Sequence, residues 1–150
     1  MILLSICIPT YNRLPYLKEL LGTVIPQLNS MQPGVVELLI SNNASTDGTT
    51  AFCQSLNSPG VRAWTNEENI GGDKNFLKCI QEARGEYVWL VGDDELLPNE
   101  SIAGVVSFLT EHHPGLLISD GDFHRTKTVY PNYRSCLDSN PSEFALRHTL

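Results

Sequence analysis

Apolar residues along the chain gather in short runs, and longer stretches with helical spacing separate these runs. Short, nearly continuous apolar runs are typical of strands that are covered on both faces. Strands that alternate with helices favour right-handed crossovers and a mainly parallel sheet. The pattern therefore predicts an α/β domain with helices on both faces of the sheet. The predicted strands span residues 2–8, 35–40, 61–64, 86–91 and 116–119.

Buried stripes and end signals predict helices between these strands. Asn12 is expected to cap the first helix, and Pro26 is expected to fray its last turn. Residues 45–47 supply capping side chains for the second helix, and Asp73 could cap the third. The expected buried stripes are Leu14, Leu17, Leu21, Val24 and Leu28 in the first helix, Phe76, Leu77, Ile80 and Ala83 in the third, and Ile102, Val105, Val106 and Leu109 in the fourth.

The pattern changes after residue 119. Residues 121–141 are polar and aromatic without a clear period, and Ser142 could cap a further helix. A chain of 150 residues suits one domain. We therefore expect a core over 1–119 and, over 120–150, the incomplete start of another region, so that the domain is truncated at its C-terminal end.

Charge and cysteine content narrow the function classes. The formal net charge of −7 argues against non-specific nucleic-acid binding, which needs a basic face. An anionic ligand would need a cation between itself and the acidic residues. The four cysteines lack the paired spacing of zinc or redox motifs, and they are expected to be buried, reduced thiols of a cytosolic protein. The apolar N-terminal run is too short for a signal peptide or a membrane span.

Polar segments follow three of the predicted strands, at residues 9–13, 41–45 and 92–95. In an open parallel sheet, ligands bind beyond the carboxyl ends of the strands, so these segments should converge on one edge. The acidic run 93–95 suits a divalent cation that bridges carboxylates to phosphate, which would also resolve the charge conflict. The other interpretation is a solvated turn that caps the next helix.

Single residues at this edge each have a functional and a structural interpretation. Tyr11 could stack on a flat base or be an ordinary loop aromatic. Asn42 and Asn43 could bond a base edge or shape a turn. Lys74, in the first turn of its helix, could face an anion or be solvated. The four histidines have no metal-ligand spacing, and we interpret them as surface residues.

Four segments, in this order and spacing, resemble the motifs of glycosyltransferase family 2. They are residues 5–13 (SICIPTYNR), 41–49 (SNNASTDGT), 69–76 (NIGGDKNF) and 85–95 (GEYVWLVGDDE). The resemblance covers about residues 3 to 119. It implies an inverting enzyme with the Rossmann-like GT-A fold, in which 1–119 is the nucleotide-sugar-binding core and 120–150 begins the acceptor side. The third motif is also similar to dideoxyhexose transferases of O-antigen assembly.

The resemblance also implies residue roles. Mn²⁺ or Mg²⁺ would be the cofactor, held by Asp94, with Glu95 as the second choice. The catalytic base would lie beyond residue 150, because Asp120 and Asp122 are the only nearby candidates and are poor ones. The residues implied to line the nucleotide-sugar are Pro9, Thr10, Tyr11, Arg13, Asn42, Asn43, Lys74 and Asp93.

The implied reaction transfers a sugar from a nucleotide-diphospho-sugar to an acceptor hydroxyl with inversion, in bacterial polysaccharide or lipopolysaccharide synthesis. The acceptor would be a saccharide or a lipid-linked saccharide. The expected location is the cytoplasm or the inner face of the membrane, with peripheral association through segments outside this chain, and nucleic acid is not expected as a partner.

One departure from the family pattern concerns the base pocket. Many members carry Asp at one or both of the positions that Asn42 and Asn43 hold here. A carboxylate only accepts hydrogen bonds, whereas an amide also donates. An amide can therefore pair with cytosine, which has an N3 acceptor, and we hypothesise that the pocket accepts cytidine donors.

Other function classes fit less well. A non-catalytic nucleotide-sugar-binding or assembly module remains the alternative, and a downstream acidic residue at the acceptor face would discriminate it from the enzyme. A phospho-receiver domain would need an acidic pair after the first strand, where residues 9–13 have none. A nicotinamide-binding domain would need G-x-G-x-x-G at the same place.

Overall fold

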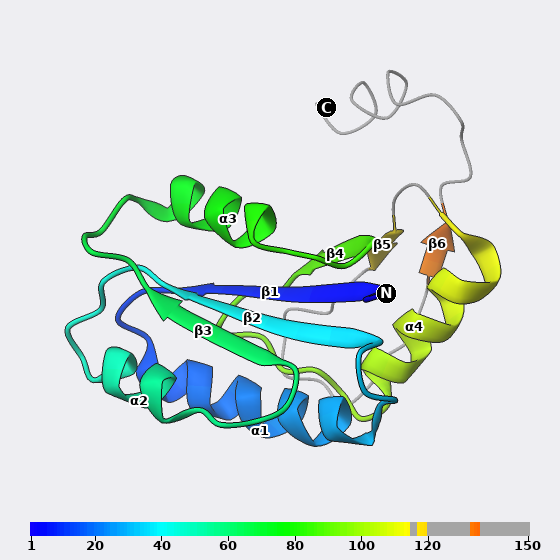
Figure 1. Cartoon of the computed structure of the whole chain (residues 1–150), viewed down its shortest axis with the longest axis horizontal. Coiled ribbons are helices and arrows are strands. Elements are labelled where there is room, and N and C mark those ends of the chain that lie inside the picture. Colours follow the sequence, from blue (N-terminus) through cyan, green and yellow to red (C-terminus); the bar gives the residue numbers. More distant parts are fainter. Residues whose placement is uncertain (115–116, 120–132, 136–150) are drawn as a thin grey trace. The chain divides into compact units, whose positions relative to one another are not determined.

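A computed structural model describes residues 1–114, 117–119 and 133–135 of the chain. Four parallel strands form one sheet in the order β3-β2-β1-β4 (Figure 1). Figure 1 shows α3 on one face of this sheet and α1 and α2 on the other. The elements are β1 (Leu4–Thr10), α1 (Leu14–Ser30), β2 (Val36–Asn42), α2 (Thr49–Ser55), β3 (Val61–Thr65), α3 (Gly72–Gln81), β4 (Tyr87–Leu90), α4 (Ser101–His112), β5 (Leu117–Ser119) and β6 (Tyr133–Ser135).

The two central strands carry the core. Every residue of β1 and of β2 is buried, which explains why their sequences are nearly continuous apolar runs. Their parallel register pairs Thr10 with Asn42, and Asn42 pairs in turn with Thr65 of β3. The carboxyl ends of these strands therefore lie along one edge, as the alternating pattern predicts.

The predicted fifth strand exists, but it does not extend the parallel sheet. β5 pairs antiparallel with β6 in a separate two-stranded sheet, where Leu117 lies opposite Ser135. Residues 1–106 and 107–150 form two compact units. The division at residue 119 stays a prediction, and Asp120, Asp122, Cys136 and Ser142 lie outside the described residues.

The buried face of α3 differs from the predicted stripe. Phe76, Leu77 and Ile80 are exposed, with 40%, 57% and 37% of their surface accessible. Asn75 and Cys79 face the sheet instead. A polar residue is stable there because the Asn75 amide donates to the Ser41 carbonyl at 2.9 Å and accepts from the Ser41 hydroxyl at 2.7 Å.

Helix ends also depart from the sequence predictions. The N-cap residues of α1 and α3 are Arg13 and Gly71, so neither Asn12 nor Asp73 holds that position. Asn12 has φ +52° and accepts a bond from another loop, while Asp73 lies inside the first turn of α3. α1 continues through Pro26 to Ser30, because the buried residues on both sides of Pro26 hold the helix against the sheet.

The described cysteines are free and buried, as predicted. Cys7, Cys53 and Cys79 have no disulfide partner within the described part of the chain. Burial, and then the charge of Asp47, raise the pKa of Cys53 to about 11, so this thiol stays protonated at neutral pH. Over the residues that the structure describes, none of the helices is both long and apolar enough to span a bilayer.

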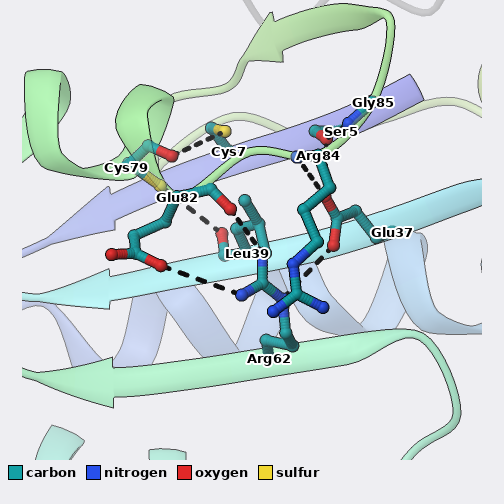
Figure 2. Close-up of polar contacts among 9 residues, drawn as sticks. All are labelled: Ser5, Cys7, Glu37, Leu39, Arg62, Cys79, Glu82, Arg84 and Gly85. Atoms are coloured by element: carbon teal, nitrogen blue, oxygen red, sulfur yellow. Dashed lines mark hydrogen bonds and ion pairs between the residues drawn. The ribbon is translucent and has the colours of Figure 1, made fainter. Parts of the chain in front are cut away.

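A buried ion pair holds the segment after α3 against the sheet (Figure 2). Glu37, 4% exposed, accepts bonds from the Ser5 hydroxyl at 2.7 Å, the Arg84 amide at 2.8 Å and Arg62 Nε at 3.2 Å. The Gly85 amide donates to the Ser5 hydroxyl at 2.8 Å. These bonds fix the start of β4, and hence the acidic segment that follows it.

Candidate functional site

Loops after β1, β2, β3 and β4 meet at the carboxyl edge of the sheet. The backbone N–H of Asn43 donates to the backbone carbonyl of Thr10 at 2.9 Å, and the backbone N–H of Asn66 donates to the backbone carbonyl of Asn42 at 2.8 Å. The Val91 amide donates to the Cys7 carbonyl at 3.0 Å. Backbone bonds therefore carry the strand register into the loops and position their side chains.

The first cluster at this edge joins the β1 loop to the acidic segment. Asp93 is 6% exposed, and its Oδ2 accepts from the Thr10 hydroxyl at 2.7 Å. Arg13 Nη1 lies 3.0 Å from Asp93 Oδ1 and 2.8 Å from Asp94 Oδ2. Hydrogen bonds to Asp93 and then to Asp94 raise the pKa of Arg13. Two loops that lie about eighty positions apart in the sequence thus form one group, made of Thr10, Arg13, Asp93 and Asp94.

Two carboxylate oxygens lie over Gly92. A Cβ atom built on Gly92 would lie 3.1 Å from Asp94 Oδ1 and 3.2 Å from Glu95 Oε1, so glycine leaves a gap between two carboxylate oxygens. Within the described residues, no group of three or more His, Cys, Asp or Glu side chains gathers to hold a metal. Two carboxylates nevertheless fit Mg²⁺ or Mn²⁺, which commonly take their remaining oxygen ligands from phosphates and water.

Bonds between the β1 and β2 loops hold the backbone on both sides of Tyr11 and Arg13. The Asn12 amide donates to the Ser45 hydroxyl at 2.8 Å, and the Thr46 amide donates to Asn12 Oδ1 at 2.7 Å. One residue after Arg13, the Leu14 amide donates to Asp47 Oδ2 at 3.0 Å. Tyr11 is 43% exposed.

Asp47 supplies the capping acceptor at the start of α1. Loss of solvent opposes ionisation of its carboxyl group. Bonds from the Thr49 hydroxyl and from the Leu14 and Thr49 amides outweigh that effect, and the pKa of Asp47 is lowered. The sequence predicts residues 45–47 as capping residues of α2, but the N-cap residue of that helix is Gly48. Asp47 precedes it and accepts from the backbone N–H groups of Thr49 in α2 and of Leu14 in α1.

The second cluster surrounds Asn43. Its Oδ1 accepts from Asn66 Nδ2 and from the Ile70 amide, each at 3.0 Å. Its Nδ2 donates to Asn69 Oδ1 at 2.8 Å. Asn66 in turn accepts from Lys78 Nζ at 2.7 Å. The side-chain oxygen of Asn43 is therefore occupied, and one of its two side-chain N–H groups has no acceptor among the described residues.

Two predicted site residues, Asn42 and Lys74, have no side-chain bond to either cluster among the described residues. Asn42 is 0% exposed, its Nδ2 donates to Thr50 and Thr65 hydroxyls at 3.0 Å each, and its Oδ1 accepts from the Ser45 amide. Its amide thus shapes the loop. Lys74 is exposed, and no bond among the described residues joins it to the two clusters.

Two residues that take part in the second cluster, Asn66 and Lys78, are not among the predicted site residues, and Asn69 belongs to them only as part of the third motif. Asn66, Asn69 and Lys78 connect to Asn43, and Asn66 follows the end of β3 directly. The rule that strand ends carry function applies to the third strand as much as to the others. Pro9 is buried in β1 and supports the edge without presenting a polar group to it.

Comparisons with known proteins show similarity to glycosyltransferases. The family model described as "Glycosyl transferase family 2" matches residues 5–149. The chain is 40% identical over 111 residues to the abequosyltransferase RfbV of Salmonella typhimurium strain LT2, covering 71% of this chain and 32% of that protein. Among solved structures, Staphylococcus aureus TarS in complex with UDP-GlcNAc matches with a TM-score of 0.67 and 28% identity, over 75% of this chain and 32% of that one.

A more distant structure shares the fold alone. The mannosyltransferase PcManGT of Pyrobaculum calidifontis, in complex with GDP-Man and Mn²⁺, matches with a TM-score of 0.64 and 24% identity over 75% of this chain and 33% of that one. The chain spans about a third of the length of each of these proteins.

Proposed function

Because this chain belongs to glycosyl transferase family 2, we propose that it is the nucleotide-sugar-binding portion of an inverting glycosyltransferase. The proposed reaction moves a sugar from a nucleotide-diphospho-sugar to an acceptor hydroxyl during bacterial polysaccharide or lipopolysaccharide synthesis. RfbV and TarS support this class, since their names describe transfer of abequose and of N-acetylglucosamine. The TarS complexes with UDP and UDP-GlcNAc support a nucleotide-sugar as donor.

The grouping of Thr10, Arg13, Asp93 and Asp94 at one sheet edge is the observation that carries the proposal. Asp93 is held by Thr10 and Arg13, so its carboxylate is oriented before any ligand arrives. Such an oriented acceptor suits a ribose hydroxyl. Arg13 adds the positive charge that an acidic chain needs next to a diphosphate.

The oxygens around Gly92 are proposed to hold the divalent cation. Asp94 would be its main protein ligand and Glu95 the second, since their oxygens flank the same gap. When bound, the cation would stabilise negative charge on the leaving diphosphate. Tyr11, with its exposed ring, would stack on the base.

The hydrogen bonds of Asn43 favour cytidine as the nucleoside. Its oxygen already accepts two bonds, so the group left for a ligand is an N–H donor. Cytosine N3 is an acceptor, whereas uracil carries a hydrogen at N3. A remaining donor therefore matches cytosine at this position and mismatches uracil.

Calorimetry would test the proposal. CDP, UDP, GDP and dTDP are titrated into the chain with and without Mn²⁺. We expect manganese-assisted binding, strongest for CDP, and we expect Asp94→Asn to weaken it by about tenfold or more, the usual scale for lost metal-site contacts. Glu19→Gln, an exposed position on α1, removes the same charge away from the site and should leave binding unchanged.

Two results would contradict parts of this proposal separately. Absence of manganese-assisted uptake of all four nucleotides would overturn the donor-binding function. Clear preference for UDP over CDP would overturn only the cytidine assignment and would leave the donor-binding function standing.

A further inference from the structure

A single guanidinium nitrogen contacts two carboxylates of the candidate site. Arg13 Nη1 contacts both Asp93 Oδ1, at 3.0 Å, and Asp94 Oδ2, at 2.8 Å. The Arg13 side chain is 47% exposed, the Asp94 side chain 51% and the Asp93 side chain 8%. The contact therefore has one buried, fixed end at Asp93 and one end in solvent at Asp94.

The Asp94 carboxylate contacts Arg13 and is also the proposed ligand of the divalent cation. Its Oδ2 is bonded to Arg13, while its Oδ1 lies with Glu95 Oε1 around the gap over Gly92. A divalent ion coordinated by Asp94 would place two positive charges next to the Arg13 guanidinium. Like charges at this separation repel each other, so the ion and Arg13 cannot both keep their best contacts with Asp94.

We propose that Arg13 is a displaceable counter-ion: it balances Asp93 and Asp94 while the donor site is empty, and it leaves Asp94 for the diphosphate when a metal-bound nucleotide enters. This proposal rests on the donor-binding function proposed above. It assigns Arg13 a positioning role in coupling the metal to the nucleotide, so that the site binds both together better than it binds the metal alone.

The surroundings of Arg13 allow this exchange without rebuilding the loop. Bonds from Asn12 to Ser45 and from Leu14 to Asp47 fix the backbone on both sides of Arg13, so only its side chain needs to move. Exposed ion pairs are weak, so little stability is lost when the Asp94 contact breaks. The Thr10 hydroxyl keeps its bond to Asp93, which preserves the geometry of that carboxylate.

The Arg13 side chain has a second contact, with the ring of Tyr16. The Arg13 guanidinium carbon lies 5.6 Å from the centre of the Tyr16 ring, within the range of a cation–π interaction. Tyr16 is itself 52% exposed. The ring gives the guanidinium a favourable surface next to the carboxylates, from which it can reach a phosphate without full solvation.

The proposal predicts effects of opposite sign on two ligands. Without Arg13, Mn²⁺ alone meets less repulsion, so Arg13→Gln should raise its affinity by about fivefold or more, in the range of ordinary coupling between sites. At saturating Mn²⁺, the same variant loses a charged donor to the diphosphate, so its affinity for CDP should fall by about tenfold. A purely structural role would lower both affinities.

Electron paramagnetic resonance of free Mn²⁺ measures the first affinity, and calorimetry with CDP at saturating Mn²⁺ measures the second. Arg84→Gln is the matched control, because it removes one charge from an exposed side chain for which no contact to the site exists among the described residues. Arg13→Lys keeps the charge and should restore most of the repulsion of Mn²⁺. Far-ultraviolet circular dichroism verifies that each variant is folded.

The outcomes separate the two proposals. If the affinities of Arg13→Gln and Arg84→Gln for Mn²⁺ differ by less than about twofold, the difference is smaller than ordinary coupling between sites. That result overturns the counter-ion role, even where nucleotide binding is intact. Unchanged CDP affinity of Arg13→Gln overturns the exchange. Failure of the unmodified chain to bind any nucleotide with Mn²⁺ overturns the donor-binding function instead, and the manganese titration still decides whether Arg13 repels the ion.

Discussion

Gly85 shows how one residue can determine the placement of a strand. A Cβ atom at this position would lie 2.6 Å from the Ser5 backbone nitrogen and 2.9 Å from the Leu4 carbonyl carbon. Backbone atoms of a buried strand cannot move away at low cost. We expect Gly85→Ala to lower the free energy of unfolding by about 1–3 kcal/mol, as overpacking does, measured by urea denaturation.

Gly22 provides the matched control for this prediction. It lies inside α1 with nothing within 4 Å of an added Cβ. Gly22→Ala should therefore stabilise the chain by about 0.5–1 kcal/mol through helix propensity. Equal effects of the two substitutions would show that close approach at Gly85 is not what requires glycine.

Asp47 predicts a pH dependence of stability. Because its pKa is lower in the folded chain than in the unfolded one, its ionised form adds stability above the unfolded pKa and loses it as pH falls through the folded pKa. Asp47→Ala should lower the free energy of unfolding by about 1 kcal/mol at neutral pH, as loss of a capping side chain does. Urea denaturation at a series of pH values measures the difference between the two chains.

The comparison of this variant with the unmodified chain should narrow at acid pH. Once Asp47 is protonated, the unmodified chain also lacks the charged acceptor, so the difference should shrink as pH falls below the ordinary carboxyl pKa of about 4. A difference that stays constant from neutral to acid pH would mean that the carboxylate charge contributes nothing to the contact with Leu14.

Single site residues were predictable where they follow a strand directly. Thr10 and Asp93 follow this rule, and the structure joins them by a hydrogen bond. The ion pair between Arg13 and the aspartates was not predictable, because it depends on how a long side chain crosses from one loop to another. Asn66 obeys the strand-end rule but was overlooked, since asparagine in a loop is typical of an ordinary turn.

At the scale of secondary-structure elements, Glu37 of β2 connects β3 to the start of β4. Removing a buried carboxylate leaves Arg62 Nε and the backbone N–H of Arg84 without their acceptor. We expect Glu37→Ala to lower the free energy of unfolding by about 3 kcal/mol, the lower end for breaking a buried pair, because Arg62 is 29% exposed. Chemical denaturation measures this value.

Glu82→Ala tests the specificity of that effect. Glu82 is 53% exposed, and its carboxylate lies 3.9 Å from the same arginine. An exposed pair of this kind contributes below about 1 kcal/mol. A loss for Glu82→Ala as large as that for Glu37→Ala would contradict the assignment of the buried carboxylate as the main partner of Arg62.

Element prediction succeeded for the buried strands and failed for one helix face. β1 and β2 are covered on both sides, so their apolar runs have a single interpretation. In α3 the apolar spacing predicts that Phe76 and Ile80 are buried, but Asn75 faces the sheet because Ser41 satisfies its amide. Hydropathy cannot predict a polar partner that comes from another strand.

At the scale of the whole chain, alternating strands and helices were sufficient to predict the parallel sheet, and its order follows from the register. The net charge of −7 belongs to the same scale, since an acidic chain holds a diphosphate only with help from cations. Arg13 and a divalent ion are the cations proposed for the first cluster at this edge. The binding of nucleotide should therefore depend on metal as a property of the folded chain.

Thermal unfolding tests that dependence. A ligand that binds only the folded chain stabilises it by about 2.7 kcal/mol at about 100 times its Kd. CDP with Mn²⁺ should accordingly raise the Tm by about 5 °C or more, and excess EDTA should abolish the shift. Asp94→Asn, if it weakens binding by about tenfold, should reduce the shift to about half, because it removes a carboxylate oxygen next to Gly92. A shift by CDP that persists in EDTA would mean that the nucleotide binds without a divalent ion, and would overturn the proposed metal dependence.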